Sequence, residues 1–267
     1  MFTPQGPSLR ELAVQALSSV ERGYDLLAPK FDQTPFRTPD TILDAVEAAL
    51  AAMGPFGHGL DLCCGTGAGV EVLREVCRES VTGLDISAGM LAVARGQVGA
   101  DGPGSEGRRA IGTDTGGPRV SWVRGDALAL PFGPAFDLAV SFGAFGHFLP
   151  DELPGLFAEV HSVLRPGGRF AFPLPAPAPP NSPWYWAALG FDTAMRVRNA
   201  LWRPPFVMYY RPFRLGVVRR ELERAGFDVD LFALPEFGRR TDGSPRCRMV
   251  VATRPEVAEP DVDGPRP

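Results

Sequence analysis

A glycine-rich stretch and two later acidic residues carry the clearest chemical potential in this sequence. Residues 60–69 read Leu-Asp-Leu-Cys-Cys-Gly-Thr-Gly-Ala-Gly, an apolar run that leads into closely spaced glycines. Glycine lets a turn adopt left-handed backbone angles and lets a ligand approach the main chain. Asp85 and Asp126 each follow a further apolar run, and carboxylates accept hydrogen bonds from ribose hydroxyls or from a base amino group. These positions together favour a ligand that contains a nucleoside.

Each acid also has a structural interpretation, since Asp85 could cap a helix and Asp126 could form an Asx-turn. The presence of Asp61 before the glycines favours the nucleoside interpretation. A dinucleotide is less well matched, because Val70 stands where the dinucleotide motif G-x-G-x-x-G has its third glycine. A carboxylate at Asp61 would also repel a pyrophosphate, whereas it suits a ligand with an ammonium group.

The elements that must position these residues alternate between strands and helices. Apolar runs predict strands, and helical periodicity predicts helices between them, an order typical of a parallel α/β sheet. The expected strands are 60–64, 81–85, 120–123, 136–142 and 169–174, with two closing strands at 227–234 and 247–252. The expected helices are 68–78, 87–98, 151–164 and 215–225, preceded by one after the capping box at 8–11 and one after 38–40.

Four segments resemble those of class I S-adenosylmethionine-dependent methyltransferases: 61–69, 83–90, 125–132 and 164–168. The resemblance covers about residues 57–174. It implies an α/β fold with a Rossmann-like seven-stranded sheet, mostly parallel, with a C-terminal antiparallel hairpin and helices on both faces. It further implies that the glycine turn holds the methionine moiety, Asp85 the ribose and Asp126 the adenine. The S-adenosyl-L-methionine contacts implied are Asp61, Cys63, Gly65, Thr66, Gly67, Asp85, Ile86, Met90, Gly125, Asp126, Ala127, Ser141 and Phe142.

Methyl transfer to a hydroxyl needs a proton acceptor, and His147 is the histidine best placed to provide one. It follows Ser141 and Phe142 in the segment where the family places residues between cofactor and acceptor, and a structural role for it is the alternative. This segment lacks the Asn/Asp-Pro-Pro-aromatic tetrad with which the family grips planar amines. We therefore expect O-methylation ahead of N- or C-methylation, on a small or medium-sized, partly apolar molecule.

Aromatic residues outside the motifs are the candidates for the acceptor pocket, with a packed helical cap as the alternative. Tyr24 and Phe31 lie in an amino-terminal segment that resembles the family's lid, and the others are Trp184, Trp186, Tyr209 and Tyr210. Residues 195–224 hold eight arginines and two glutamates, a net charge of +6 that could attract an anionic substrate or a membrane surface.

Composition and motifs suggest five parts. These are a helical lid at 1–56, the methyltransferase core at 57–174, a substrate cap rich in proline, aromatic residues and arginine at 175–226, a closing hairpin at 227–254 and a disordered tail at 255–267. A loose glycine-rich insertion is expected at 99–119.

The 267 residues carry a formal net charge of −4, which disfavours nucleic acid as a partner. The four cysteines form no C-x-x-C pair, and no metal site is expected. No apolar run is long enough for a membrane span, although peripheral contact stays open, and we expect a cytoplasmic protein. The competing functions are an NAD(P)-dependent oxidoreductase and a non-catalytic S-adenosylmethionine-binding protein.

Overall fold

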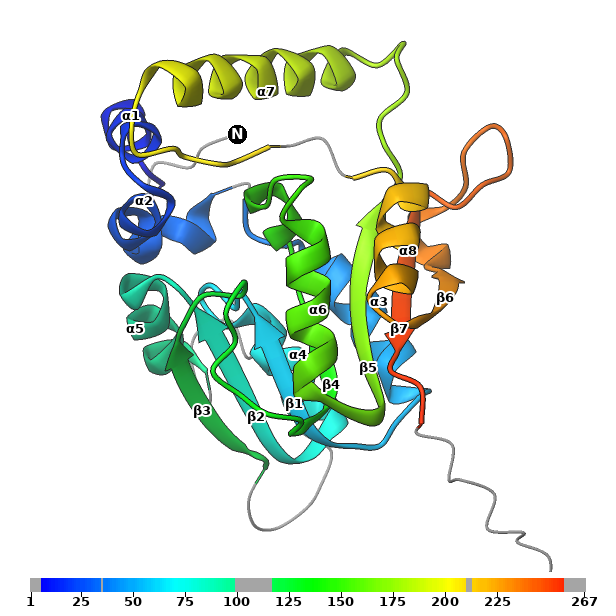
Figure 1. Ribbon diagram of the computed structural model, residues 1–267. Helices are drawn as coiled ribbons and strands as arrows, with labels where there is room; N and C mark the ends of the chain where they lie inside the picture. Colours follow the sequence, from blue (N-terminus) through cyan, green and yellow to red (C-terminus); the bar gives the residue numbers. More distant parts are fainter. Residues whose placement is uncertain (1–5, 35, 99–116, 210–212, 257–267) are drawn as a thin grey trace, which may run out of the picture.

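The computed structural model describes residues 6–34, 36–98, 117–209 and 213–256, and its centre is a seven-stranded sheet (Figure 1). The strand order is β3-β2-β1-β4-β5-β7-β6, and β7 runs antiparallel to both β5 and β6. This arrangement confirms the predicted fold class. The strands are β1 (Phe56–Leu62), β2 (Cys77–Asp85), β3 (Arg119–Arg124), β4 (Phe136–Val140), β5 (Leu164–Pro175), β6 (Asp228–Ala233) and β7 (Cys247–Thr253).

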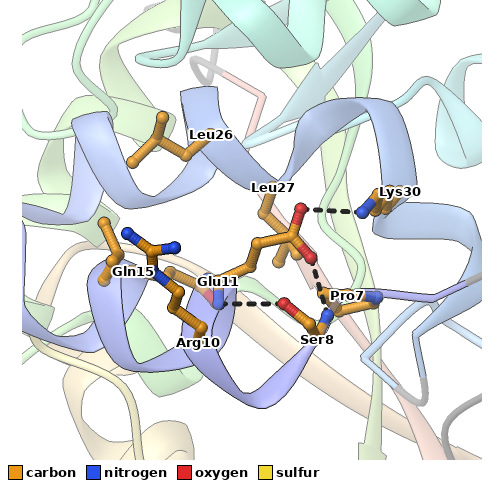
Figure 2. Close-up of a pocket in the computed structure, with 9 residues that line it drawn as sticks. Pro7, Ser8, Arg10, Glu11, Gln15, Leu26, Leu27 and Lys30 are labelled. Carbon is orange, nitrogen blue, oxygen red and sulfur yellow. Dashed lines mark hydrogen bonds and ion pairs between the residues drawn. The ribbon is translucent and has the colours of Figure 1, made fainter.

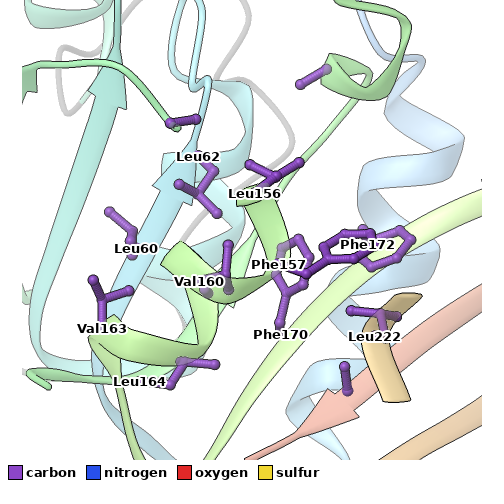
Figure 3. Close-up of a cluster of buried hydrophobic side chains, with 14 of the residues drawn as sticks. Leu60, Leu62, Leu156, Phe157, Val160, Val163, Leu164, Phe170, Phe172 and Leu222 are labelled. Carbon is purple, nitrogen blue, oxygen red and sulfur yellow. The ribbon is translucent and has the colours of Figure 1, made fainter. Parts of the chain in front are cut away.

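Neighbouring strand residues pack into two different cores, because successive side chains point to opposite faces of a sheet. On β4, Ala139 joins one buried cluster while Leu138 and Val140 join the other. The first cluster lies under α6 (Leu153–Val163) and α8 (Leu215–Arg224), and Figure 3 shows its aromatic centre at Phe157, Phe170 and Phe172. The second cluster lies under α3 (Asp40–Ala51), α4 (Ala68–Val76) and α5 (Ala88–Gln97). Helices therefore cover both faces, as predicted.

The amino-terminal periodicity predicts one helix, but the structure has two, α1 (Leu9–Leu17) and α2 (Val20–Leu27), followed by the 3₁₀ turn η1 (Ala28–Gln33). The Ser8–Glu11 capping box forms as expected. The break falls at Ser18-Ser19, where the Ser19 hydroxyl accepts a hydrogen bond from the Arg22 amide and starts α2. A serine side chain competes with helical backbone bonds, so it favours a new helix start there.

The aromatic stretch after β5 forms the helix α7 (Pro183–Leu201), which begins with the Ser182 side chain as N-cap and proline in its first turn. Figure 1 shows α7 on the side of the sheet where the parallel strands end. The chain then returns through Phe206, whose fully buried ring packs at Gly23 of α2. A Cβ atom at position 23 would stand 2.7 Å from that ring, so the close approach requires glycine.

Two expectations fall largely outside the described residues. These are residues 99–116 of the glycine-rich insertion and residues 257–267 of the tail.

Candidate active site

The turn after β1 combines three left-handed residues in five positions. Cys63, Gly65 and Gly67 have φ angles of 55°, 54° and 96°. At Gly67 a Cβ atom would stand 2.6 Å from Val98 Cγ2, so both the angle and the space require glycine. Cys63 is the one described non-glycine residue with positive φ. Sequence analysis gave Cys63 as an implied cofactor contact and did not predict its left-handed angle.

Asp61 is a buried carboxylate beside this turn, with 1% of its surface exposed. Within the described part of the chain, neither of its oxygens has a hydrogen-bond partner. Burial, and secondly the nearby Asp85, raise the pKa of Asp61 well above its usual range, and the Val70 amide offsets part of that pKa shift without reaching hydrogen-bond geometry. The carboxylate also needs Gly69, where a Cβ atom would stand 2.5 Å from Asp61 Oδ2. A buried carboxyl group of this kind is suited to a positively charged ligand.

Asp85 lies at the end of β2 and joins the glycine turn to the next loop. Its Oδ2 accepts a hydrogen bond from the Gly65 amide at 2.8 Å, and its Oδ1 accepts one from the Ser87 amide at 2.8 Å. Burial raises the pKa of Asp85, and the amide donors oppose that rise. Asp85 does not cap the following helix, since the Ser87 side chain does. The carboxylate is thus fixed beside Gly65, as the predicted nucleoside site requires.

The loops after β2 and β3 supply further candidate cofactor contacts. Met90 is buried in the first turn of α5, while Ile86 is 40% exposed. Gly125 donates its amide to the Asp85 carbonyl, which holds the two loops together. Asp126 is exposed, and its Oδ1 accepts a hydrogen bond from the Leu128 amide at 2.9 Å, so the Asx-turn forms. Its Oδ2 is then the oxygen that could accept a hydrogen bond from an adenine amino group. The remaining contact in this group, Ala127, is buried.

Ser141 and Phe142 follow β4 and border the same turn. The Ser141 hydroxyl donates to the Leu62 carbonyl at 3.1 Å, which ties the ends of β4 and β1. The Phe142 ring lies against Gly69, where a Cβ atom would approach it to 2.6 Å. The residues at the carboxyl ends of β1, β2 and β4 therefore meet at one edge of the sheet, which is where α/β proteins bind ligands.

Three acids of the amino-terminal segment contact these loops, and sequence analysis assigned them no role. Asp32 accepts from the Thr66 hydroxyl at 2.7 Å, after β1. Asp25 Oδ1 accepts from the Ser87 hydroxyl at 2.6 Å and from the Gly89 amide at 2.8 Å, after β2. Glu21 pairs with Arg124 at the end of β3. The signal available in the sequence is the repeat of an aromatic–acid pair seven residues apart, Tyr24-Asp25 and Phe31-Asp32.

His147 lies in the 3₁₀ turn η2 (Ala144–His147), and both of its ring nitrogens have partners. Nδ1 lies 2.8 Å from the Val207 carbonyl, which can only accept, so Nδ1 carries the hydrogen. Nε2 then has the lone pair and accepts from the Tyr24 hydroxyl at 2.9 Å. Burial lowers the pKa of His147 below 6.5, with the Val207 carbonyl opposing. The imidazole is thus neutral near pH 7 and can take a proton.

The predicted aromatic residues do not form one pocket wall. Tyr24 packs edge-on against Phe31, and Tyr209 pairs its backbone amide with the Gly146 carbonyl beside His147. Trp184 and Trp186 lie in the first turn of α7 and are 62% and 61% exposed. Tyr210 lies outside the described residues. The structure therefore brings Tyr24, Phe31 and Tyr209 to the His147 side and leaves the tryptophans facing solvent.

A separate cavity of about 560 Å³ lies between α1 and α2. Figure 2 shows the Lys30–Glu11 ion pair across it, and none of the predicted site residues lines it. Its walls are Pro7, Ser8, Arg10, Glu11, Val14, Gln15, Leu26, Leu27 and Lys30. Across residues 6–34, 36–98, 117–209 and 213–256, no group of three or more His, Cys, Asp or Glu side chains could hold a metal ion. In the same residues no helix has the length and apolarity of a membrane span.

Comparison with known proteins identifies the domain that contains the glycine turn. The family described as "Methyltransferase domain" matches residues 60–168. A 2-phytyl-1,4-naphtoquinone methyltransferase of Thermosynechococcus vestitus is 36% identical over 114 residues, 42% of this chain and 43% of that protein. A demethylmenaquinone methyltransferase of Lactiplantibacillus plantarum is 34% identical over 169 residues, 59% of this chain and 63% of that protein. The chain thus spans less than two thirds of either relative.

The fold is also shared with a solved structure, the magnesium protoporphyrin IX methyltransferase of Synechocystis with bound S-adenosylhomocysteine. The TM-score is 0.51 at 20% identity, over 79% of this chain and 81% of that one.

Proposed function

We propose that this chain, whose residues 60–168 form a class I S-adenosylmethionine-dependent methyltransferase domain, moves a methyl group to a hydroxyl of a small, partly apolar molecule. The observation that carries the proposal is the buried Asp61 carboxylate, which has no hydrogen-bond partner in the described residues. An unpaired buried charge is costly, so its place beside the glycine turn is best explained by a cationic ligand. The methionine ammonium of the cofactor is such a cation.

The chain's residues fit this cofactor in chemistry and in space. Asp61 would accept from the ammonium group, and Gly65 and Gly67 leave the main chain open beside it. Asp85 would accept from the ribose and Asp126 from the adenine amino group. S-adenosylmethionine supplies a methyl group on a positively charged sulfur, which is already activated for transfer, so the protein mainly has to orient the acceptor.

The acceptor side is built from three segments that meet at His147. These are Tyr24 of α2, the η2 turn and residues 206–209 after α7. The Phe31 and Phe206 rings lie beside the Tyr24 ring, which packs edge-on against His147. The relatives' names specify a naphthoquinone and a demethylmenaquinone, which are ring systems with carbonyl groups. We propose an acceptor of related structure in its reduced form, in which ring hydroxyls replace the carbonyls and apolar substituents remain.

Tyr24 and His147 would handle the proton that the acceptor hydroxyl loses. As the new carbon–oxygen bond forms, this proton passes to the Tyr24 oxygen, and Tyr24 gives its own proton to His147 Nε2. The neutral state of His147 makes its lone pair available, and the Val207 carbonyl stabilises the imidazolium through Nδ1. The reaction needs a base because the acceptor oxygen still carries its proton; an acceptor without this proton would need none.

The test is methyl transfer from labelled S-adenosylmethionine to a reduced naphthoquinone panel and to a metabolite extract, with products analysed by mass spectrometry and NMR. The expected product carries the label on an oxygen. Label on a ring carbon or a nitrogen would overturn the O-methylation assignment. Cofactor binding without any transfer would favour a non-catalytic binding protein, and tight NAD(H) binding without a response to S-adenosylhomocysteine would favour an oxidoreductase.

A further inference from the structure

The helix α7 has an exposed apolar side. Of its 19 residues, only Ala188, Asp192 and Met195 are buried, and they follow one another at helical spacing on one narrow side. On the opposite side Trp186, Val197 and Leu201 are 61%, 53% and 80% exposed. A helix at a protein surface normally carries charged or polar residues there.

The stripe between these residues is almost free of polar groups. Gly190 and Thr193 fill the intervening turns, so residues 186, 190, 193, 197 and 201 recur every three or four positions with threonine as the polar member. Trp202, which caps the helix, is 55% exposed and extends the stripe at its end. Figure 1 shows that α7 is not among the helices that cover the sheet. The apolar side is therefore available to a partner.

The charges around the stripe have one sign. Arg196 and Arg203 flank its carboxyl-terminal half, while the Arg198 guanidinium donates to the Pro204 and Ser18 carbonyls. Asp192, the one acid in residues 183–209, is buried. Arginine heads attract anionic lipid head groups, and tryptophan places an apolar ring and a polar N–H at the boundary between lipid and water. An apolar stripe with such flanks is the pattern of a helix that lies in a membrane interface.

We propose that α7 docks on an anionic phospholipid surface, with Trp186, Val197, Leu201 and Trp202 entering the head-group region. The surface extends toward α1, because Arg198 Nη2 donates to the Ser18 carbonyl at 3.2 Å and the adjacent Leu17 is 52% exposed. From α7 the chain runs directly to Val207 beside His147. If the proposed function holds, a lipid-dissolved acceptor would reach the site from this side, but the docking itself does not depend on that function.

The experiment is co-sedimentation of the full chain with vesicles of phosphatidylcholine alone and of phosphatidylcholine with about 30% phosphatidylglycerol, at low and high salt. Binding is expected to the anionic vesicles, with weakening by salt and a blue shift of tryptophan fluorescence. The double variant Val197→Glu/Leu201→Glu should weaken it about tenfold or more, since it places two charges in the apolar stripe. Arg203→Glu should weaken binding to anionic vesicles alone.

The matched control for Leu201→Glu alone is Phe232→Glu, which also puts one negative charge on an exposed apolar residue, here on β6. It should leave vesicle binding unchanged, and circular dichroism should show that every variant is folded. Equal binding of all variants, or no binding of the unaltered chain, would overturn the proposal. A dimer in light scattering that Leu201→Glu dissociates would also overturn it, in favour of a second copy on α7. Calorimetry with S-adenosylhomocysteine, without vesicles, tests the methyltransferase assignment separately.

Discussion

At the scale of single residues, the candidate site consists of groups held in states that water would not favour. Asp61 is buried without a hydrogen-bond partner in the described residues, Cys63 adopts a left-handed angle, and His147 is kept neutral by burial. Such departures cost stability and are concentrated where a protein binds or reacts. By contrast, burial raises the pKa of the Cys63 and Cys64 thiols well above the usual range, which disfavours the reactive thiolate form.

Asp61→Asn should weaken S-adenosylhomocysteine binding by about 10- to 100-fold, since it removes a charged partner worth about 1.5–3 kcal/mol. The same variant should be more stable than the unaltered protein at neutral pH. Asp61 has a raised pKa in the folded state, so its contribution to stability is present below about pH 4 and is lost as the pH rises through the folded pKa. Calorimetry and urea unfolding across pH measure both effects.

An Asp61→Asn protein with unchanged affinity would contradict the ammonium assignment. Glu223→Gln, on an exposed ion pair of α8, is the control for removal of an acidic charge.

His147→Gln should lower turnover about 100-fold or more if the imidazole takes the acceptor's proton. Tyr24→Phe should lower turnover while it leaves S-adenosylhomocysteine binding intact, because the phenol donates to His147 rather than to a cofactor residue. Protonated His147 cannot accept a proton, so activity should fall as the pH drops through its lowered pKa, which places the acid limb below 6.5. A loss of less than threefold in His147→Gln would assign the histidine a structural role.

At the scale of elements, the amino-terminal segment closes the edge of the sheet by hydrogen bonds to three successive loops. Asp32, Asp25 and Glu21 contact the loops or strand ends after β1, β2 and β3 respectively. These strands are neighbours in the sheet, so one helix and the turn after it can reach all three. The same segment also carries Tyr24 to His147. The segment thus joins the strand-end loops to the turn that holds His147.

Asp25→Ala should speed the release of S-adenosylhomocysteine several-fold, because it removes the acceptor shared by the Ser87 hydroxyl and the Gly89 amide. Stopped-flow displacement measures the release rate. Asp40→Ala is the control, since this exposed acid at the start of α3 pairs with Arg37 and contacts none of the three loops. Equal release rates in the two variants would show that the segment does not restrain the ligand.

At the scale of the whole molecule, the candidate site and the hydrophobic cores occupy different parts of the sheet. The two clusters beneath the helices pack all along β1 and β4, while the site occupies only the carboxyl ends of the strands. Arginine is also unevenly distributed along the chain, since residues 195–224 hold eight of these residues. A ligand should therefore stabilise the folded protein as a unit without changing its core.

S-adenosylhomocysteine at about 100 times its dissociation constant should add about 2.7 kcal/mol to the free energy of unfolding. For a chain of this size that corresponds to a rise in melting temperature of about 5–10 °C. Differential scanning calorimetry measures the shift, with NADH as the control ligand, for which no shift is expected. A shift with NADH alone would support the oxidoreductase alternative.

The sequence by itself determined the sheet, the glycine turn and the acids at the strand ends. All seven strands were predicted, because apolar runs, glycine spacing and acids at strand ends are local signals that survive without a structure. The strand bounds differ from the prediction: β1 begins at Phe56 and not at position 60, because its pairing with β2 already starts before the apolar run. Helical periodicity did not reveal α7, since its apolar residues occupy both the buried and the exposed side.

The tertiary structure decided which distant residues meet. Tyr24 and His147 are 123 positions apart, and Asp25 reaches Ser87 across 62 positions. No local pattern encodes such pairs, because they depend on how the amino-terminal helices pack against Phe206 and Gly23. The lack of a partner at Asp61 is likewise a property of packing, since it is the surrounding fold that excludes water and hydrogen-bond donors. Sequence thus specified the proposed cofactor side through local chemistry, and tertiary packing specified the proposed acceptor side.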